Sequence, residues 1–229
     1  MYITEKKPDV IICIGDFADL PSLSSYDVGK KSFEGRRYKA DIEAVHAGME
    51  ALLGPIEEFN ANQRKNNKKL YKPRKVLTLG NHEQRIQRVV ESDPKLDGTI
   101  GLDDLRYREF GWEVYPFLDV VVVDGIAYSH YFTSGLLGRP VGTANALLAK
   151  KHQSCIAGHQ QGRQVAYATR ADGSTITGII LGSCYEHEEE YLGIQGNKHY
   201  RGLAVLHEVR NGMFDEMFVS LDYLKGKYV

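Results

Sequence analysis

The 229-residue sequence has few cysteines and no long apolar run. Its three cysteines, Cys13, Cys155 and Cys184, lie far apart in apolar surroundings, unlike those of a disulfide framework or a cysteine-rich zinc site. We expect them to be buried thiols in a reducing compartment. No stretch approaches the roughly 20 apolar residues of a membrane helix, and the start has no signal-peptide pattern. We therefore expect a cytoplasmic protein with no membrane partner.

The sequence also has no excess of charge of either sign. It has 29 Lys and Arg against 30 Asp and Glu, a formal net charge of -1, which is typical neither of a nucleic-acid coat protein nor of a membrane-surface binder. The exception is the segment from Arg64 to Lys75, in which seven of twelve residues are basic. A solvated loop is the commoner interpretation. The alternative is a nucleic-acid contact through Arg64, Lys65, Lys68 and Lys69, with Tyr71 stacking on a base.

The order of apolar patterns predicts the class of fold. Early in the chain, β-branched runs at 9–15 and 75–79 alternate with helical periodicity at 38–63 and 83–91, where Pro55 is expected to kink or divide the longer helix. A short helix is expected near 103–109. Later, Asp-Gly or Asn-Gly pairs at 124, 172 and 211 predict hairpins. Strand–helix alternation followed by hairpins favours a layered α/β sandwich with a mixed sheet, in a single domain over residues 1–229.

Four fragments rich in metal ligands each follow an apolar run that reads as a strand. They are Gly15-Asp16-Phe17-Ala18-Asp19, Gly80-Asn81-His82-Glu83, Ser129-His130 and Gly158-His159. If their polar side chains converge, they offer a carboxylate, an amide oxygen and two imidazoles. This mixed set suits Mn, Fe, Zn, Co or Ni better than Ca or Mg. Such a metal would bind a phosphate oxygen and acidify a water molecule, giving a nucleophile at neutral pH.

His82 lies beside this expected metal site without having to bind the ion. A histidine there can protonate the departing oxygen of a phosphoester, and Asp19 is the natural partner to fix its tautomer. Arg85, and also Arg36 and Arg37, are candidates for gripping the substrate phosphate.

Each of these residues also has a purely structural interpretation. Asp16 could close a turn, Asn81 and His82 could cap the next helix, and His130 and His159 could be hydrogen-bonded structural histidines. The presence of all four fragments, in order and at strand ends, favours the metal site.

The four fragments together resemble the calcineurin-like metallophosphoesterase superfamily. Its ordered signature is Asp-x-His, Gly-Asp-x-x-Asp, Gly-Asn-His-Asp/Glu, His and Gly-His-x-His, and the likeness runs from about Pro8 to beyond Tyr200. The wording Gly-Asn-His-Glu-Gln-Arg-Ile is most similar to phage and prophage-type members. The resemblance implies a four-layer sandwich of two mixed β-sheets flanked by helices. It also implies that Asp16 bridges two metals, most readily Mn, that Asn81, His130 and His159 complete one metal's shell, and that His82 and Asp19 act as general acid and partner.

Two departures from the signature affect the other metal. No Asp-x-His precedes Gly15, and Gln161 stands where many members have the final histidine. We expect that the first strand and helix of the family are missing, because the start lies too far downstream or because the form is naturally shortened; a ligand from elsewhere or from another subunit is a third explanation. Glu186, His187 and Glu188 are the best spare ligands, although a solvated acidic loop is the commoner interpretation.

We therefore predict a metal-dependent phosphodiesterase that acts on nucleotides or nucleic acid through a metal-activated water. The alternatives are a phosphomonoesterase acting on phosphoproteins and a non-catalytic remnant that binds one metal or a nucleic acid. A sheet without its first strand would expose a central edge, so a homo-oligomer is a further expectation.

Overall fold

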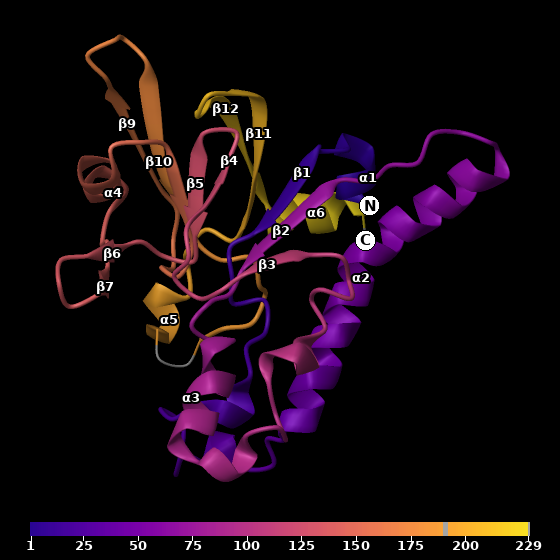
Figure 1. The fold of residues 1–229 in the computed structure, drawn as a ribbon, viewed down its shortest axis with the longest axis vertical. Coiled ribbons are helices and arrows are strands. Elements are labelled where there is room, and N and C mark those ends of the chain that lie inside the picture. The colour runs from indigo at the N-terminus through magenta and orange to yellow at the C-terminus, as the bar shows by residue number, and fades with distance from the viewer. Residues whose placement is uncertain (190–191, 229) are drawn as a thin grey trace. The chain divides into compact units, whose positions relative to one another are not determined.

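The computed structural model describes residues 1–189 and 192–228. It shows an α/β chain that separates into two compact units, Met1–Phe117 and Leu118–Val229 (Figure 1). Each unit is described by itself, and the expected single domain stays a prediction. Within the described residues, no helix is both long enough and apolar enough to cross a membrane.

The first unit is built on a three-stranded sheet in the order β1 (Val10–Cys13), β2 (Arg74–Thr78), β3 (Glu113–Tyr115). Both strand pairs are parallel, so this sheet is not mixed, contrary to the prediction. The difference follows from the connections, because strands joined through helical segments, as β1 and β2 are through α2, run parallel. The strands β1 and β3 form the edges of the sheet, and the expected homo-oligomer stays a prediction.

Three helices and several short turns of 3-10 helix complete this unit. They are α1 (Tyr2–Lys6), α2 (Tyr38–Lys65), α3 (Gln84–Ser92), η1 (Pro21–Leu23), η2 (Lys31–Phe33), η3 (Pro94–Leu96) and η4 (Leu102–Leu105). The short helix expected near 103–109 is thus the 3-10 turn η4, one residue earlier and ending sooner.

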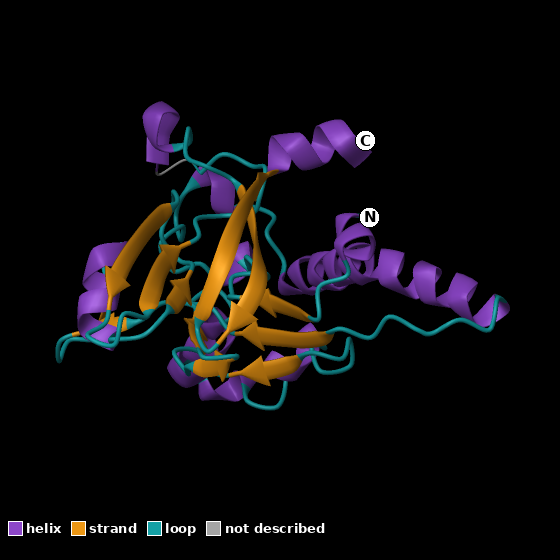
Figure 2. Cartoon of the chain, turned by 90° about the horizontal axis from the view of Figure 1, so that it is seen from above, coloured by secondary structure: helices purple, strands orange, loops and turns teal. Residues whose placement is uncertain are grey.

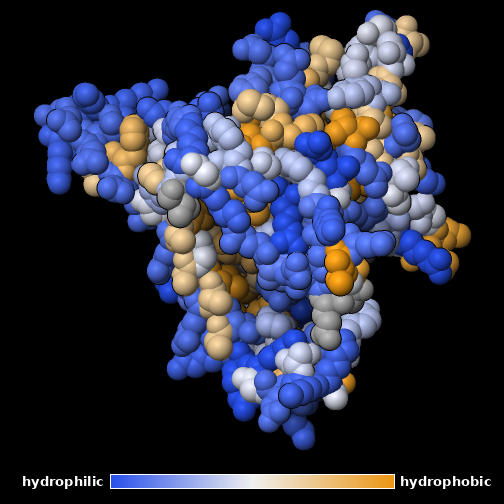
Figure 3. All heavy atoms as spheres, turned by 180° about the vertical axis from the view of Figure 1, so that it is seen from behind, coloured by the Kyte–Doolittle hydropathy of each residue, from blue (hydrophilic) through white to orange (hydrophobic). Residues whose placement is uncertain are grey.

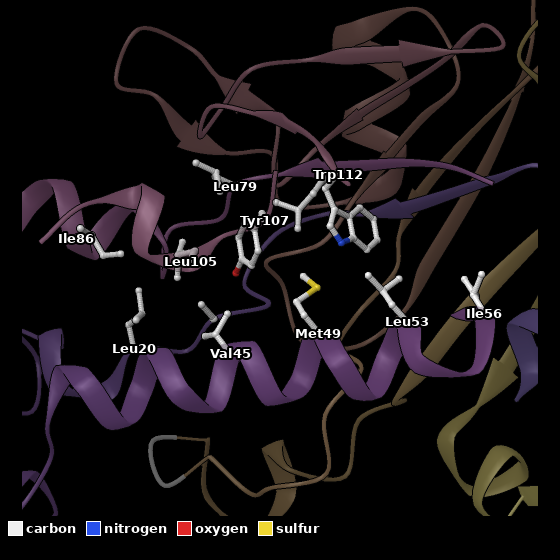
Figure 4. Close-up of a cluster of buried hydrophobic side chains, with 12 residues drawn as sticks. Leu20, Val45, Met49, Leu53, Ile56, Leu79, Ile86, Leu105, Tyr107 and Trp112 are labelled. Carbon is white, nitrogen blue, oxygen red and sulfur yellow. The ribbon is translucent and has the colours of Figure 1, made fainter. Parts of the chain in front are cut away.

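The helix α2 carries most of the core of the first unit. Its buried apolar residues Val45, Met49, Leu53 and Ile56 recur every three or four positions and so form one face. This face packs against side chains such as Trp112 (Figure 4). Pro55 lies inside the helix and does not divide it, so that part of the prediction was wrong. Leu53 and Ile56 pack against the same core on either side of the proline, which favours a continuous helix despite the hydrogen bond that proline cannot make.

The second unit contains a five-stranded mixed sheet in the order β4-β5-β8-β10-β9. Its strands are β4 (Val121–Val123), β5 (Ile126–Ser129), β8 (Cys155–Ala157), β9 (Gln164–Thr169) and β10 (Thr175–Ile180). The three central strands are parallel, and both outer strands are antiparallel to their neighbours. The helix α4 (Ala144–Lys151) packs on this sheet through buried Leu147 and Leu148 (Figure 2). The predicted mixed sheet is therefore present in this unit.

The three predicted hairpins are all formed. They join β4 to β5, β9 to β10, and β11 (Gly202–Arg210) to β12 (Met213–Ser220). At the first and last, both turn residues have positive φ, as Asp-Gly and Asn-Gly turns favour. The remaining elements are β6 (Thr133–Ser134), β7 (Arg139–Pro140), α5 (Gly193–Gly196) and α6 (Leu221–Tyr228).

The visible surface is mostly hydrophilic. In Figure 3 the apolar residues occur in small separate groups, the usual distribution on a folded protein.

Candidate metal and phosphate site

In the first unit, the loops that follow β1 and β2 hold the predicted site residues side by side. These strands are parallel neighbours, so their carboxyl ends lie at the same edge of the sheet. The Asp16 backbone has a φ of 53°, and its Oδ1 accepts a hydrogen bond from the His82 N–H at 2.9 Å. A Cβ on Gly80 would overlap both Oδ1 and the backbone nitrogen of Asp16, so only glycine fits there.

Glu83 fastens these two loops together from below. Its side chain is fully buried and accepts hydrogen bonds from the backbone N–H groups of Asp16 (3.0 Å), Ala18 (3.0 Å) and Gly80 (2.8 Å). The Tyr107 hydroxyl donates a fourth, at 3.1 Å. Burial, together with the Asp16 carboxylate, raises the pKa of Glu83, and burial also raises the pKa of Tyr107. The loops are therefore shaped by a carboxylate that lies beneath them.

His82 is held by the predicted partner. Its Nδ1 lies 2.7 Å from Asp19 Oδ1, and its Nε2 lies 3.2 Å from Arg85 Nη2. Because arginine can only donate, Nε2 accepts in this arrangement and the ring proton is on Nδ1, where it is donated to Asp19. The tautomer follows from these two contacts. Nε2 also lies 3.9 Å from Asp16 Oδ2, so the acid, its partner and the proposed ligand form one cluster.

The arginines expected to grip phosphate are engaged with the protein. Arg85 Nη1 donates to the carbonyl of Asp19 at 2.7 Å and to that of Leu20 at 3.3 Å. Arg36 donates to the Asp27 carboxylate and to the Pro21 carbonyl, and Arg37 donates to the carbonyl of Arg36. Arg85 thus positions the His82 loop, and its role as a phosphate contact stays a prediction.

Asn81 lies between Gly80 and His82 and is half-buried. Its backbone carbonyl accepts a hydrogen bond from Arg88 at 3.2 Å. The residue at the cap position of α3 is Glu83 and not Asn81 or His82, so the capping interpretation of those two residues was wrong.

In the second unit, His130 and His159 lie together at the ends of two adjacent strands. The parallel pair β5 and β8 places Ser129 opposite Ala157, and the Gly158 N–H donates to the carbonyl of His130 at 2.9 Å. His130 Nε2 lies 3.2 Å from His159 Nδ1, and the rings meet at 76°. Two imidazole nitrogens bound tetrahedrally to one ion at about 2.1 Å would be about 3.4 Å apart. The pair therefore fits two ligands of one transition metal.

The spare ligands suggested by the sequence are used otherwise. His187 Nε2 lies 3.0 Å from Glu189 Oε1, and Glu186 forms an ion pair with Lys225 at 3.1 Å. Over residues 1–189 and 192–228, none of Glu186, His187 and Glu188 belongs to a group of three potential metal-ligating side chains.

Tyr107 and the structural role of Glu83 were missed by sequence reasoning. Tyr107 lies in a charged stretch with no motif, and only its aromatic character among polar neighbours pointed to burial.

Comparison with known proteins found no matching family model, no matching curated protein and no matching solved structure. The resemblance to the calcineurin-like metallophosphoesterases therefore stands on the four motifs of the sequence.

Proposed function

We propose that this chain is a metal-dependent phosphoester hydrolase that cleaves phosphodiesters of nucleotides or nucleic acid. The observation that carries the proposal is the His82–Asp19 pair, 2.7 Å apart, next to the Asp16 carboxylate. A histidine oriented by a carboxylate, beside a second carboxylate at a strand end, is the arrangement that general-acid catalysis next to a metal requires. The fold expected with this activity is the four-layer sandwich, and the compartment expected is the cytoplasm.

The ligands of the proposed ion are Asp16, Asn81, His130 and His159. The 3.2 Å separation of the two imidazole nitrogens supports a transition metal, with Mn first and Fe, Zn, Co or Ni as alternatives. When bound, the ion would polarise the phosphoryl group and lower the pKa of a water molecule to about 7, as zinc does in hydrolases.

The chain's own residues supply the proton transfer and its orientation. Asp19 accepts the Nδ1 proton of His82 and stabilises the imidazolium form, in which Nε2 carries the second proton to the leaving oxygen. Arg85 Nη2 now donates to this same Nε2. Protonation of Nε2 removes that acceptor, which frees Nη2 to donate to a phosphate oxygen while Nη1 remains on the carbonyls of Asp19 and Leu20.

The test is hydrolysis of bis(p-nitrophenyl) phosphate with Mn²⁺ by the chain and by its His82→Ala variant. We expect the variant to lose about 10²–10⁴-fold in rate, the usual contribution of a general acid, while it still binds Mn²⁺ by calorimetry. A matched control is His207→Ala, because His207 is an exposed histidine on β11 and should leave the rate unchanged. Full activity in His82→Ala would contradict the proposed role.

The same assay separates the other two functions. Faster cleavage of p-nitrophenyl phosphate than of the diester would favour a phosphomonoesterase. Metal binding without turnover of either ester would favour a non-catalytic remnant.

A further inference from the structure

The last turn of α2 extends beyond the core of the first unit. The buried residues of this helix end at Asn60, yet the helix continues to Lys65. The chain then turns at Asn66 and Asn67, the latter with a φ of 51°, and runs back to β2. Figure 1 shows this end of α2 and the returning loop projecting from the strands β1 and β2. We call residues 60–72 the basic hairpin.

The basic hairpin is held in shape by its base. Asn60 Oδ1 accepts from the Tyr71 N–H at 2.8 Å, and Asn60 Nδ2 donates to the Tyr71 carbonyl at 2.7 Å. The Tyr71 hydroxyl donates to the Pro8 carbonyl at 2.7 Å, and its ring meets Phe59 edge-on. The returning segment is therefore fixed against the helix, which lowers the entropy lost when its side chains engage a partner.

The basic hairpin has five cationic side chains and no acidic one. The cations are Arg64, Lys65, Lys68, Lys69 and Lys72, and all are exposed. Within the described residues, none of these five side chains forms a hydrogen bond or an ion pair. The two remaining basic residues of the segment differ, because Arg74 is bound to Glu113 and Lys75 donates to the Phe110 carbonyl. The structure thus narrows the basic segment to five unpaired charges on one rigid support.

We propose that the basic hairpin binds the phosphate backbone of duplex nucleic acid. Clustered, unpaired Lys and Arg neutralise phosphates and release counterions, which drives such binding. Tyr71 was expected to stack on a base, but its ring is half-buried against Phe59 and its hydroxyl is bound. Without that stacking platform, single strands lose the contact that they usually require, so the duplex backbone is the favoured partner.

The position of the basic hairpin has a consequence for the substrate, which rests on the proposed function. The beginning of α2 lies near the site loops, since Asp41 accepts from the Ser22 N–H at 3.0 Å and Leu20 packs over the first half of the helix (Figure 4). The basic hairpin lies at the other end of this 28-residue helix. At 1.5 Å per residue the helix is about 42 Å long. Only a polymer of roughly 12 base pairs or more, at 3.4 Å each, would reach both ends.

The test is fluorescence anisotropy of a labelled 24-base-pair DNA duplex, titrated with the whole chain in EDTA at 50 to 200 mM KCl. If five phosphates are contacted, the log–log slope of affinity against salt is about −4, and affinity falls roughly 10²-fold over this range. Replacing the five cations by Gln should lower affinity at 50 mM KCl on the order of 10²-fold and flatten the slope. The matched control replaces five exposed lysines elsewhere by Gln, namely Lys31, Lys39, Lys95, Lys150 and Lys198.

Equal binding by the two five-site variants would overturn the proposal, as would binding to anionic lipid vesicles but not to the duplex. Circular dichroism confirms that both variants are folded. Because EDTA excludes hydrolysis, the two proposals fail separately. Hairpin-dependent duplex binding without bis(p-nitrophenyl) phosphate cleavage would refute only the proposed hydrolase, and cleavage with equal duplex binding would refute only the basic hairpin.

Discussion

At the scale of single residues, Asp27 provides a test of how charge stabilises the loop before α2. Lys30 first, and then Arg36, hold the pKa of Asp27 far below its usual range through hydrogen bonds at 2.7 and 2.8 Å. A depressed carboxyl pKa stabilises the fold above the unfolded value of about 4, and this stability is lost as the pH falls below it. We expect Asp27→Asn to lower the thermal midpoint at pH 7 and to have less effect at pH 2.5.

The measurement is a thermal unfolding series between pH 7 and pH 2.5. Asp119→Asn is the control, since Asp119 is an exposed aspartate with no printed ion pair within the described chain. A difference between Asp27→Asn and the parent chain that does not change with pH would contradict the linkage.

The residue contacts of the site were only partly predictable. The pairing of His82 with Asp19 followed from chemistry, because a histidine in a catalytic position requires a tautomer partner and the motif offered one. The contact of Tyr107 with Glu83 joins residues 24 positions apart in no regular pattern. Arg85 was expected to face substrate, but its guanidinium finds backbone carbonyls nearer by. Such contacts depend on how loops close, which the periodicity of a sequence does not encode.

At the scale of elements, the packing of α4 on the five-stranded sheet depends on one glycine. A Cβ on Gly178 of β10 would lie 2.8 Å from the Ala144 carbonyl oxygen and 2.9 Å from Leu148 Cγ. We expect Gly178→Ala to lower the free energy of unfolding by about 1–3 kcal/mol, because the helix has to move away from the strand. Gly54→Ala is the matched control: its Cβ would meet no atom within 4 Å on α2, and it should stabilise by about 0.5–1 kcal/mol.

Urea denaturation measures both variants. Equal stability of Gly178→Ala and the parent chain would show that α4 adjusts without cost.

The elements themselves were largely predictable, since the periods of strand and helix patterns reflect which face is buried. The hairpins followed from their turn residues, and α2 from its apolar spacing. The expected break at Pro55 was wrong because tertiary packing on both sides of the proline outweighs its local preference. The parallel character of the first sheet depends on connections, to which pattern alone is blind.

At the scale of the whole molecule, the proposed ion should appear as a gain in stability. A ligand that binds only the folded chain stabilises it by about 2.7 kcal/mol at 100 times its dissociation constant. For a chain of this length that corresponds to a rise of roughly 5–10 °C in the thermal midpoint. We expect Mn²⁺ to produce such a rise, EDTA to reverse it, and His159→Ala to abolish it while His207→Ala retains it. An undiminished rise in His159→Ala would exclude that residue as a ligand.

The buried carboxylate of Glu83 also determines how the first unit opens. Loop amides usually exchange their hydrogens with solvent quickly, because small local fluctuations suffice to expose them. The amides of Asp16, Ala18 and Gly80 instead donate to a carboxylate that solvent does not reach. Their hydrogens can leave only when the core around Glu83 opens. These three loop amides should therefore exchange as slowly as those of the strands β1 and β2, so that the site residues belong to the last part of the unit to unfold.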